Sequence, residues 1–326
     1  MESIPAGGRY KRFAAGALIL NVVIVLGGAL VRATKSGAGC GAHWPLCDGE
    51  VIPGLKSYHQ SIEFSHRLLV GVGIIVVLSL WAGIRKNYPR TAQVRKAAAF
   101  SMFFTFTESL IGAALVLFKW EGTDQSIQRI FAVSSHLINT LLLLASLFLV
   151  YWGCSHEEEL DFRGNPKVFA ANLWSMLITV VIGISGAITA LGDTLFPAAS
   201  RAEIARSVSQ NSPLLTKIRV VHPAIALTGL AVIALLCWKV TQLTQSESVA
   251  NWAWLTVLAG VVQTTIGMLN LFMLVPLYLQ LIHLLVADIF WFSLLGLTAR
   301  SLTRRFVGNA VISRDALPLT TAGNLL

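Results

Sequence analysis

The sequence predicts an all-α membrane protein with eight transmembrane helices, and three observations support this fold class. Of the 326 residues, 55% are hydrophobic and only 13% are charged, which leaves too little polar surface for a soluble protein of this length. The apolar runs are roughly 20 residues long, the length that a helix needs to cross a hydrocarbon core of about 30 Å. They lack the short, alternating pattern of β-barrel strands, so helices are the expected spanning elements.

In chain order, the eight runs divide evenly around a polar linker at residues 153–167. The first run directly follows the basic segment Arg9 to Arg12, so we expect a retained span and not a cleaved signal peptide. A long polar segment, residues 34–62, separates the first two runs. The expected spans are residues 13–33, 64–84, 97–118, 129–152, 168–190, 218–240, 251–270 and 277–298.

The positions of the basic residues predict the orientation of the spans. With the N-terminus inside, most of the 25 Lys and Arg residues fall in cytoplasmic segments, as the positive-inside rule requires. Both termini are therefore expected in the cytoplasm and residues 34–62 outside. The net charge of +9 suits anionic lipid head groups of the bilayer, and no basic stripe with interleaved aromatic residues suggests nucleic acid. Without a transit peptide before the first span, a bacterial plasma membrane is the expected location.

Internal similarity predicts two tandem four-helix bundles. The matched segments keep the same order in both halves, and an even number of spans in each half makes them parallel repeats. We expect an N-terminal half at 1–152, the linker at 153–167, and a C-terminal half at 168–326 that ends in a short cytoplasmic tail. The matches are Gly28-Ala29 with Gly186-Ala187, Phe64 to Arg67 with Val220 to Pro223, Glu108 to Gly112 with Gln263 to Gly267, and His136 with His283.

A histidine enters the second and the fourth span of each half from the expected outer side. A single histidine at such a position is often only interfacial. Paired neutral imidazoles, however, are axial ligands of haem iron, and one pair in each bundle would form a haem clamp. We therefore pair His66 with His136, and His222 with His283; His43 and His59, in the outer loop, are weaker candidates.

The two halves differ in the residue that precedes the first histidine by three positions. Glu63 precedes His66, and Arg219 precedes His222. In a helix this spacing puts both side chains of a pair on nearly the same face, about one turn apart. A carboxylate there can take a proton or stabilise positive charge, whereas an arginine suits a haem propionate or a stable haem. Arg67, next to His66, is a second candidate for a propionate.

Two further sets of polar residues leave alternatives open. Cys40 and Cys47, in the outer loop, are either a structural disulfide or a redox-active pair, since short exposed disulfides can have higher potentials; they lack the ligands for a zinc site. Glu108 and Asp288 lie in the middle of apolar spans, where carboxylates are usually functional or paired. We expect a packing or hydrogen-bonding role for Glu108 and no direct contact of Asp288 with His283, and we count neither as catalytic.

Several of these motifs resemble haem A synthase. The resemblance rests on the run Gly27 to Gly37, Cys40, the run Trp44 to Cys47, and the run Ile62 to Arg67, together with eight spans and four histidines. It covers essentially residues 10–300 and is more specific in the first half. Family members often have a second cysteine pair in the matching outer loop of the C-terminal half, but residues 191–217 contain no cysteine.

The resemblance implies an enzyme that oxidises the C8 methyl of haem O to a formyl group through a hydroxymethyl intermediate, for cytochrome oxidase biogenesis. It implies that His66 and His136 hold the substrate haem, that Glu63 takes part in the chemistry, and that His222 and His283 ligate the iron of haem b. The implied partners are a haem O synthase and an unidentified electron acceptor, and a homo-oligomer is left open. Two alternatives remain: a bis-histidine electron-transfer cytochrome and a haem carrier without chemistry.

Overall fold

The computed structural model describes residues 8–54, 56–156, 158–207 and 214–303. Within these ranges eight helices are long and apolar enough to cross a membrane, so the prediction of an all-α, multi-pass membrane protein is confirmed. Two short elements, η1 (Ser36–Ala38) and α6 (Arg201–Arg206), accompany them. The long helices are α1 (Gly8–Ala33), α2 (Tyr58–Asn87), α3 (Gln93–Leu117), α4 (Ile127–Ser155), α5 (Pro166–Leu195), α7 (Leu214–Thr244), α8 (Glu247–Phe272) and α9 (Leu277–Ser301).

Several helices begin before their apolar runs because polar residues cap their first turns. The Ser57 side chain accepts the Gln60 N–H of α2 at 3.1 Å, and Ser126 does the same for Arg129 of α4 at 3.2 Å. Asn165 caps α5, with Pro166 in the first turn, where a missing N–H costs nothing. As a result, α2 starts at Tyr58, and Glu63 already lies within the helix.

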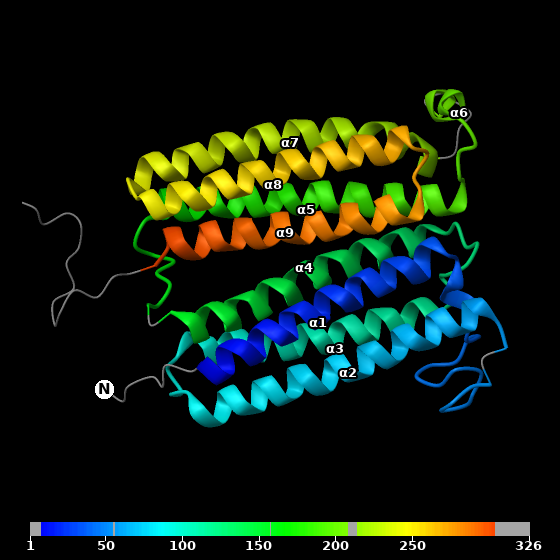
Figure 1. Cartoon of the computed structure of the whole chain (residues 1–326), viewed down its shortest axis with the longest axis horizontal. Coiled ribbons are helices and arrows are strands. Elements are labelled where there is room, and N and C mark those ends of the chain that lie inside the picture. The colour runs from blue at the N-terminus through cyan, green and yellow to red at the C-terminus, as the bar shows by residue number, and fades with distance from the viewer. Residues whose placement is uncertain (1–7, 55, 157, 208–213, 304–326) are drawn as a thin grey trace, which may run out of the picture.

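The long helices form two neighbouring groups, α1 to α4 and α5 with α7 to α9 (Figure 1). α1 begins and α9 ends at the same end of the molecule. The opposite end carries α6 and the connections at residues 34–57, 118–126 and 273–276, and we call it the loop end (Figure 1). α2, α4, α7 and α9 all begin there.

Two apolar cores meet on α4, which contributes side chains to both. One side of α4 packs with α1 to α3, where Val77, Leu80 and Leu147 are fully buried. The other side contributes Leu144 to a core shared with α5 and α7 to α9. The buried Trp291 indole N–H of α9 donates to the Leu141 carbonyl of α4 at 3.1 Å, which satisfies two polar groups inside this contact.

Corresponding helices have corresponding neighbours in the two groups. α1 packs on α2, and α3 packs on α4; likewise α5 packs on α7, and α8 packs on α9. The contacts α2 with α3 and α7 with α8 also match. This is the arrangement that a duplicated four-helix unit would have, and the duplication, its boundaries and the membrane orientation stay predictions.

Candidate functional site

The four candidate haem histidines all lie within about three turns of the loop end. His66, His136, His222 and His283 belong to the helices that begin there, α2, α4, α7 and α9 (Figure 1). His66 and His136 are within electrostatic range of each other, and so are His222 and His283. The members of each predicted pair are therefore near one another, and that either pair holds a haem stays a prediction.

Glycines on neighbouring helices make room for these imidazole rings. A Cβ at Gly27 of α1 would lie 3.1 Å from His66 Nδ1, and one at Gly186 of α5 would lie 3.1 Å from His222 Cε1. A Cβ at Gly267 of α8 would lie only 2.8 Å from His283 Cε1. At 2.8 Å a Cβ would force the ring to move, and at 3.1 Å the ring would have to shift by a few tenths of an ångström. Of the aligned glycines, Gly28 and Gly186 both face a histidine ring, since a Cβ would lie 3.4 Å from His66 Cε1 and 3.1 Å from His222 Cε1.

Polar contacts to the rings differ between the halves. Ser185 Oγ lies 2.8 Å from His222 Nδ1, whereas Nδ1 of His66 is buried without a hydrogen-bond partner among the described residues. Glu108 Oε1 lies 3.2 Å from His136 Nδ1. The sequence aligned Glu108 with Gln263 and His136 with His283, but that alignment does not show that Glu108 and His136 touch.

Glu63 is buried, with 3% of its surface exposed, and is held by two groups at the loop end. Its Oε2 accepts the Cys40 N–H at 2.8 Å, and its Oε1 forms an ion pair with Arg67, one turn further along α2. Glu63 lies within α2, which is the condition for the one-turn spacing between Glu63 and His66. The carboxylate is tied to the outer loop, and its proximity to a group held by His66 stays a prediction.

The two arginines predicted for propionates are both engaged in ion pairs. Arg67 Nη1 also donates to the carbonyls of His43 and Leu46, each at 2.6 Å, so it fastens the outer loop to α2. Arg219, 2% exposed, pairs with Asp193 of α5 and donates to the Phe196 carbonyl at 2.7 Å. The sequence did not indicate Asp193, because it lies on another helix, 26 residues before Arg219.

The Cys40–Cys47 disulfide is present, with 4.5 Å between the Cα atoms. Both cysteines are buried, at 0% and 1% exposure, so the exposure on which the redox alternative depended is not found. The expected closeness to the site is found, since the Cys40 N–H binds Glu63. A structural role for the disulfide agrees with this burial, and a redox role stays a prediction.

A second carboxylate, Glu121, lies near Glu63 in the connection between α3 and α4, and the sequence did not indicate it. Its Oε2 would be 3.2 Å from a Cβ at Gly37, so its side chain reaches the outer loop. Burial, and then the charge of Glu63, raise the pKa of Glu121 to about 8, although Arg67 and Arg129 oppose this rise. Glu121 therefore adds a protonatable group to the loop end.

The donor sets suit a haem better than a bare metal ion. No group of three or more His, Cys, Asp or Glu that could hold an ion occurs in the ranges that the structure describes. A porphyrin provides the in-plane nitrogens itself and needs only axial ligands, which paired imidazoles supply. The glycine-backed rings fit such a group, as does the absence of a hydrogen bond to Nδ1 of His66, His136 and His283 among the described residues. His59, 3.0 Å from Ser36 Oγ, belongs to neither pair.

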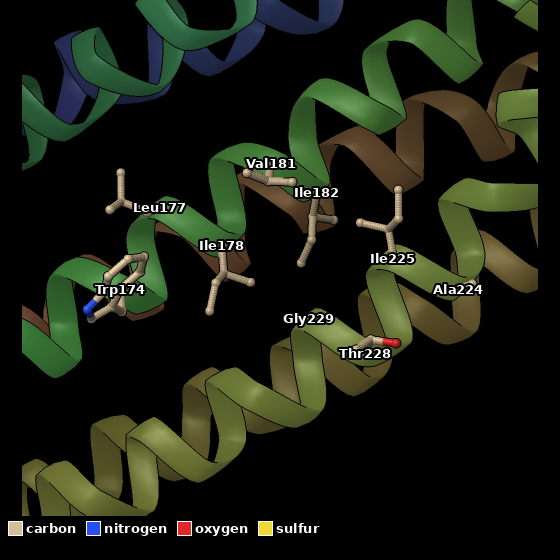
Figure 2. A pocket seen from close by; sticks show the side chains of 9 residues that line it. All are labelled: Trp174, Leu177, Ile178, Val181, Ile182, Ala224, Ile225, Thr228 and Gly229. Carbon is tan, nitrogen blue, oxygen red and sulfur yellow. The ribbon is translucent and has the colours of Figure 1, made fainter. Parts of the chain in front are cut away.

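An apolar groove between α5 and α7 lies apart from this chemistry (Figure 2). Thr228 supplies the only side-chain hydroxyl among its lining residues, none of which is titratable. Trp174 and Val181 on its rim are largely exposed on the outside of the bundle, as expected for a surface that faces lipid acyl chains. The lining residues are Trp174, Leu177, Ile178, Val181, Ile182, Ala224, Ile225, Thr228 and Gly229.

Fold and site together define a multi-pass membrane protein with two histidine pairs that suit haem ligation. The family model COX15-CtaA, described as cytochrome oxidase assembly protein, matches residues 11–61 and 55–295. The chain therefore belongs to this family, which includes haem A synthases, and the resemblance seen in the sequence is confirmed.

Curated relatives carry two different names. A heme A synthase of Lysinibacillus sphaericus is 39% identical over 137 residues, 42% of this chain and 44% of that protein. A heme A synthase of Geobacillus thermodenitrificans is 32% identical over 170 residues, 52% of this chain and 53% of the relative. A protoheme IX farnesyltransferase of Thermus thermophilus is 39% identical over 302 residues, 92% of this chain and 50% of the relative. The chain thus spans about half the length of the curated relatives that it matches.

Proposed function

We propose that this chain is a haem A synthase, an oxidoreductase that converts the C8 methyl of haem O to a formyl group through a hydroxymethyl intermediate, for cytochrome oxidase biogenesis. The observation that carries this proposal is the asymmetry of the two histidine pairs. Only the first half has a buried carboxylate, Glu63, one turn before its histidine, whereas the second half has Arg219 at that position. A substrate site beside a cofactor site needs such a difference.

In this proposal each histidine pair binds one haem, and Glu63 acts in the chemistry. His66 and His136 hold the substrate haem, and His222 and His283 hold haem b, whose iron supplies a redox centre when bound. Glu63 is oriented by the Cys40 N–H and by Arg67, so it offers a fixed carboxylate for a proton or for positive charge. Arg67 and Arg219 would lie towards the propionates while keeping their ion pairs.

The relative from Thermus thermophilus suggests a partner and not a second activity. The name of that protein describes farnesyl transfer to protoheme IX, the class of reaction that supplies a farnesylated haem. This chain matches only half of that protein, so the name is not carried over to it. We propose a haem O synthase as the source of substrate, together with an electron acceptor whose identity is open.

The setting that fits these roles is a bacterial plasma membrane with the loop end outside and both termini in the cytoplasm. Most basic residues lie at the other end, as the positive-inside rule requires. The disulfide at the loop end also agrees with an oxidising compartment. In this arrangement residues 1–152 form the substrate half and residues 168–326 the haem b half.

The decisive experiment replaces Glu63 with Ala in protein expressed with a source of haem O. We expect the purified variant to keep haem b and to contain no haem A or hydroxymethyl precursor, because the histidines are intact and the carboxylate is gone. Mass analysis of extracted porphyrins and a reduced-minus-oxidised spectrum measure both. Normal haem A production would refute the role of Glu63. Parent protein that holds only haem B would favour an electron-transfer cytochrome, and haem O returned unchanged would favour a carrier.

A further inference from the structure

The histidines on α4 and α9 are contacted through different ring nitrogens. Glu108 of α3 approaches Nδ1 of His136 at 3.2 Å, whereas Gln263 of α8 approaches Nε2 of His283 at 3.3 Å. Glu108 and Gln263 correspond in the internal alignment, as do the two histidines. The two halves have therefore placed a carboxylate and an amide at the same position, next to different atoms of the ring.

Glu108 is held in place by the helix that carries His136. Its carboxylate accepts hydrogen bonds from Asn139 Nδ2 at 2.5 Å and from Thr140 Oγ1. The Asn139 amide also donates to the Phe104 carbonyl at 2.8 Å and accepts from Thr107 Oγ1 at 2.6 Å. A carboxylate within a membrane span is expensive unless it has such partners, and this network fixes the direction in which Glu108 meets the ring.

A carboxylate next to Nδ1 has a known effect on a metal-binding histidine. It accepts the Nδ1–H, which fixes the tautomer, leaves Nε2 free to ligate and makes the ring a stronger donor. His66, the other member of the first pair, has no such support. Its Nδ1 faces Gly27, and no carboxylate of the described residues forms an ion pair with it. Nδ1 of His136 also lacks a hydrogen bond of ordinary geometry, so its contact with Glu108 is an ion-pair approach at 3.2 Å. The residue that corresponds to Gly27 in the second half is Ser185, which reaches His222 Nδ1 at 2.8 Å.

We propose that Glu108 is a positioning residue that makes His136 the fixed and stronger axial ligand of the first half, and that His66 is the exchangeable ligand. This inference rests on the proposed function, which places the substrate haem between these two histidines. A substrate haem must enter the site and its product must leave. One histidine that stays bound to the iron and one that dissociates from it would allow this exchange. His66, the exchangeable ligand, is on the same helix as Glu63.

The test uses full-length protein and haem titration with optical redox measurements. In Glu108→Gln we expect the reduction potential of the first-half haem to rise, because the carboxylate no longer supports the ligand, and haem affinity there to fall about 10- to 100-fold. Glu108→Asp, which keeps the charge, should recover part of the affinity. The second-half haem should keep the parent spectrum and potential in both variants, which controls for folding. An unchanged potential and affinity in Glu108→Gln would overturn the proposal.

Single replacements of the two histidines test the unequal ligands. We expect His136→Ala to lose more haem affinity than His66→Ala, and added imidazole to restore the parent spectrum more readily in His66→Ala. Equal losses, or the reverse order, would overturn the assignment of the fixed ligand. If neither replacement changes haem binding, the histidine pair itself is wrong and the proposed function fails. If both replacements weaken binding but Glu108→Gln has no effect, only the present inference fails.

Discussion

At the scale of single residues, the loop end concentrates carboxylates and arginines that are removed from water. Glu63 and Arg67 form one buried ion pair, and Asp193 and Arg219 form another. Breaking such a pair by removing one partner leaves an uncompensated charge, which costs more than the pair itself contributes. Glu121 differs from these residues because it forms no ion pair with any described residue. Its burial instead raises the pKa of its carboxyl group.

Glu121 should make the stability of the protein depend on pH. Its pKa is raised from 4.5 to about 8 by burial and by the charge of Glu63, so the folded protein binds this proton more tightly than the unfolded chain does. The contribution of Glu121 is fully present below its unfolded pKa and is lost as the pH rises through its folded pKa. In Glu121→Gln we expect the Tm in detergent to fall less between about pH 5 and about pH 9.

The matched control for this prediction is Glu50→Gln, which removes an exposed carboxylate from the outer loop. Its Tm should follow that of the parent across the same pH range. A Glu121→Gln variant whose Tm tracks the parent all the way from about pH 5 to about pH 8 would show that this carboxyl ionises in the folded protein without cost.

At the scale of helices, the apolar runs predicted all eight spans but not their ends. Hydropathy does not detect a polar turn that is stabilised by a cap, such as the one that Ser57 provides at the start of α2. α6 and η1 were missed because neither contains an apolar run. The histidine pairs were predictable because the repeat preserves them. The contact of Glu108 with His136 was not, because sequence periodicity does not tell which face of α3 meets α4.

The close packing of α8 against α9 gives a prediction at this scale. Gly267→Ala would bring a Cβ to 2.8 Å from His283 Cε1, so the ring must move, and we expect loss of the second-half haem from the purified protein. Gly112→Ala is the control at the corresponding position of α3, where a Cβ meets no atom within 4 Å. It should keep both haems and stabilise the helix by about 0.5–1 kcal/mol. Equal haem content in the two variants would argue against the position of His283.

At the scale of the whole molecule, the two helix groups are held together by apolar contacts of α4 and α1 with α5 and α9, and by polar bonds that include the one from Trp291 to Leu141 and a set from Arg32. Arg32, at the end of α1, donates to the Ala190 carbonyl at 2.5 Å and to Thr194 Oγ1 at 2.7 Å, both on α5. It also donates to Gln280 Oε1 of α9 at 3.2 Å. The partners of Arg32 lie in the other group of helices and could not be predicted from the local sequence pattern.

Removing Arg32 should weaken the association of the halves more than the fold of either. In Arg32→Ala we expect a loss of about 1.5–3 kcal/mol, the range for hydrogen bonds to a charged group. Protein cleaved by protease at an inserted site in the 153–167 linker should separate into halves at a lower denaturant concentration than cleaved parent. Arg12→Ala, which removes an exposed arginine bound only locally to the Gly8 carbonyl, is the control. Identical separation of the three proteins would assign the association to the apolar core alone.

The common depth of the four histidines determines how the membrane potential acts on electron transfer between the two halves. Because all four lie within about three turns of the loop end, an electron that passes from one half to the other would travel parallel to the membrane plane. A charge that crosses the whole bilayer gains or loses about 2.3 kcal/mol per 100 mV of membrane potential, whereas a lateral transfer gains almost nothing. The exchange between the halves should therefore run at the same rate in energised and de-energised membranes.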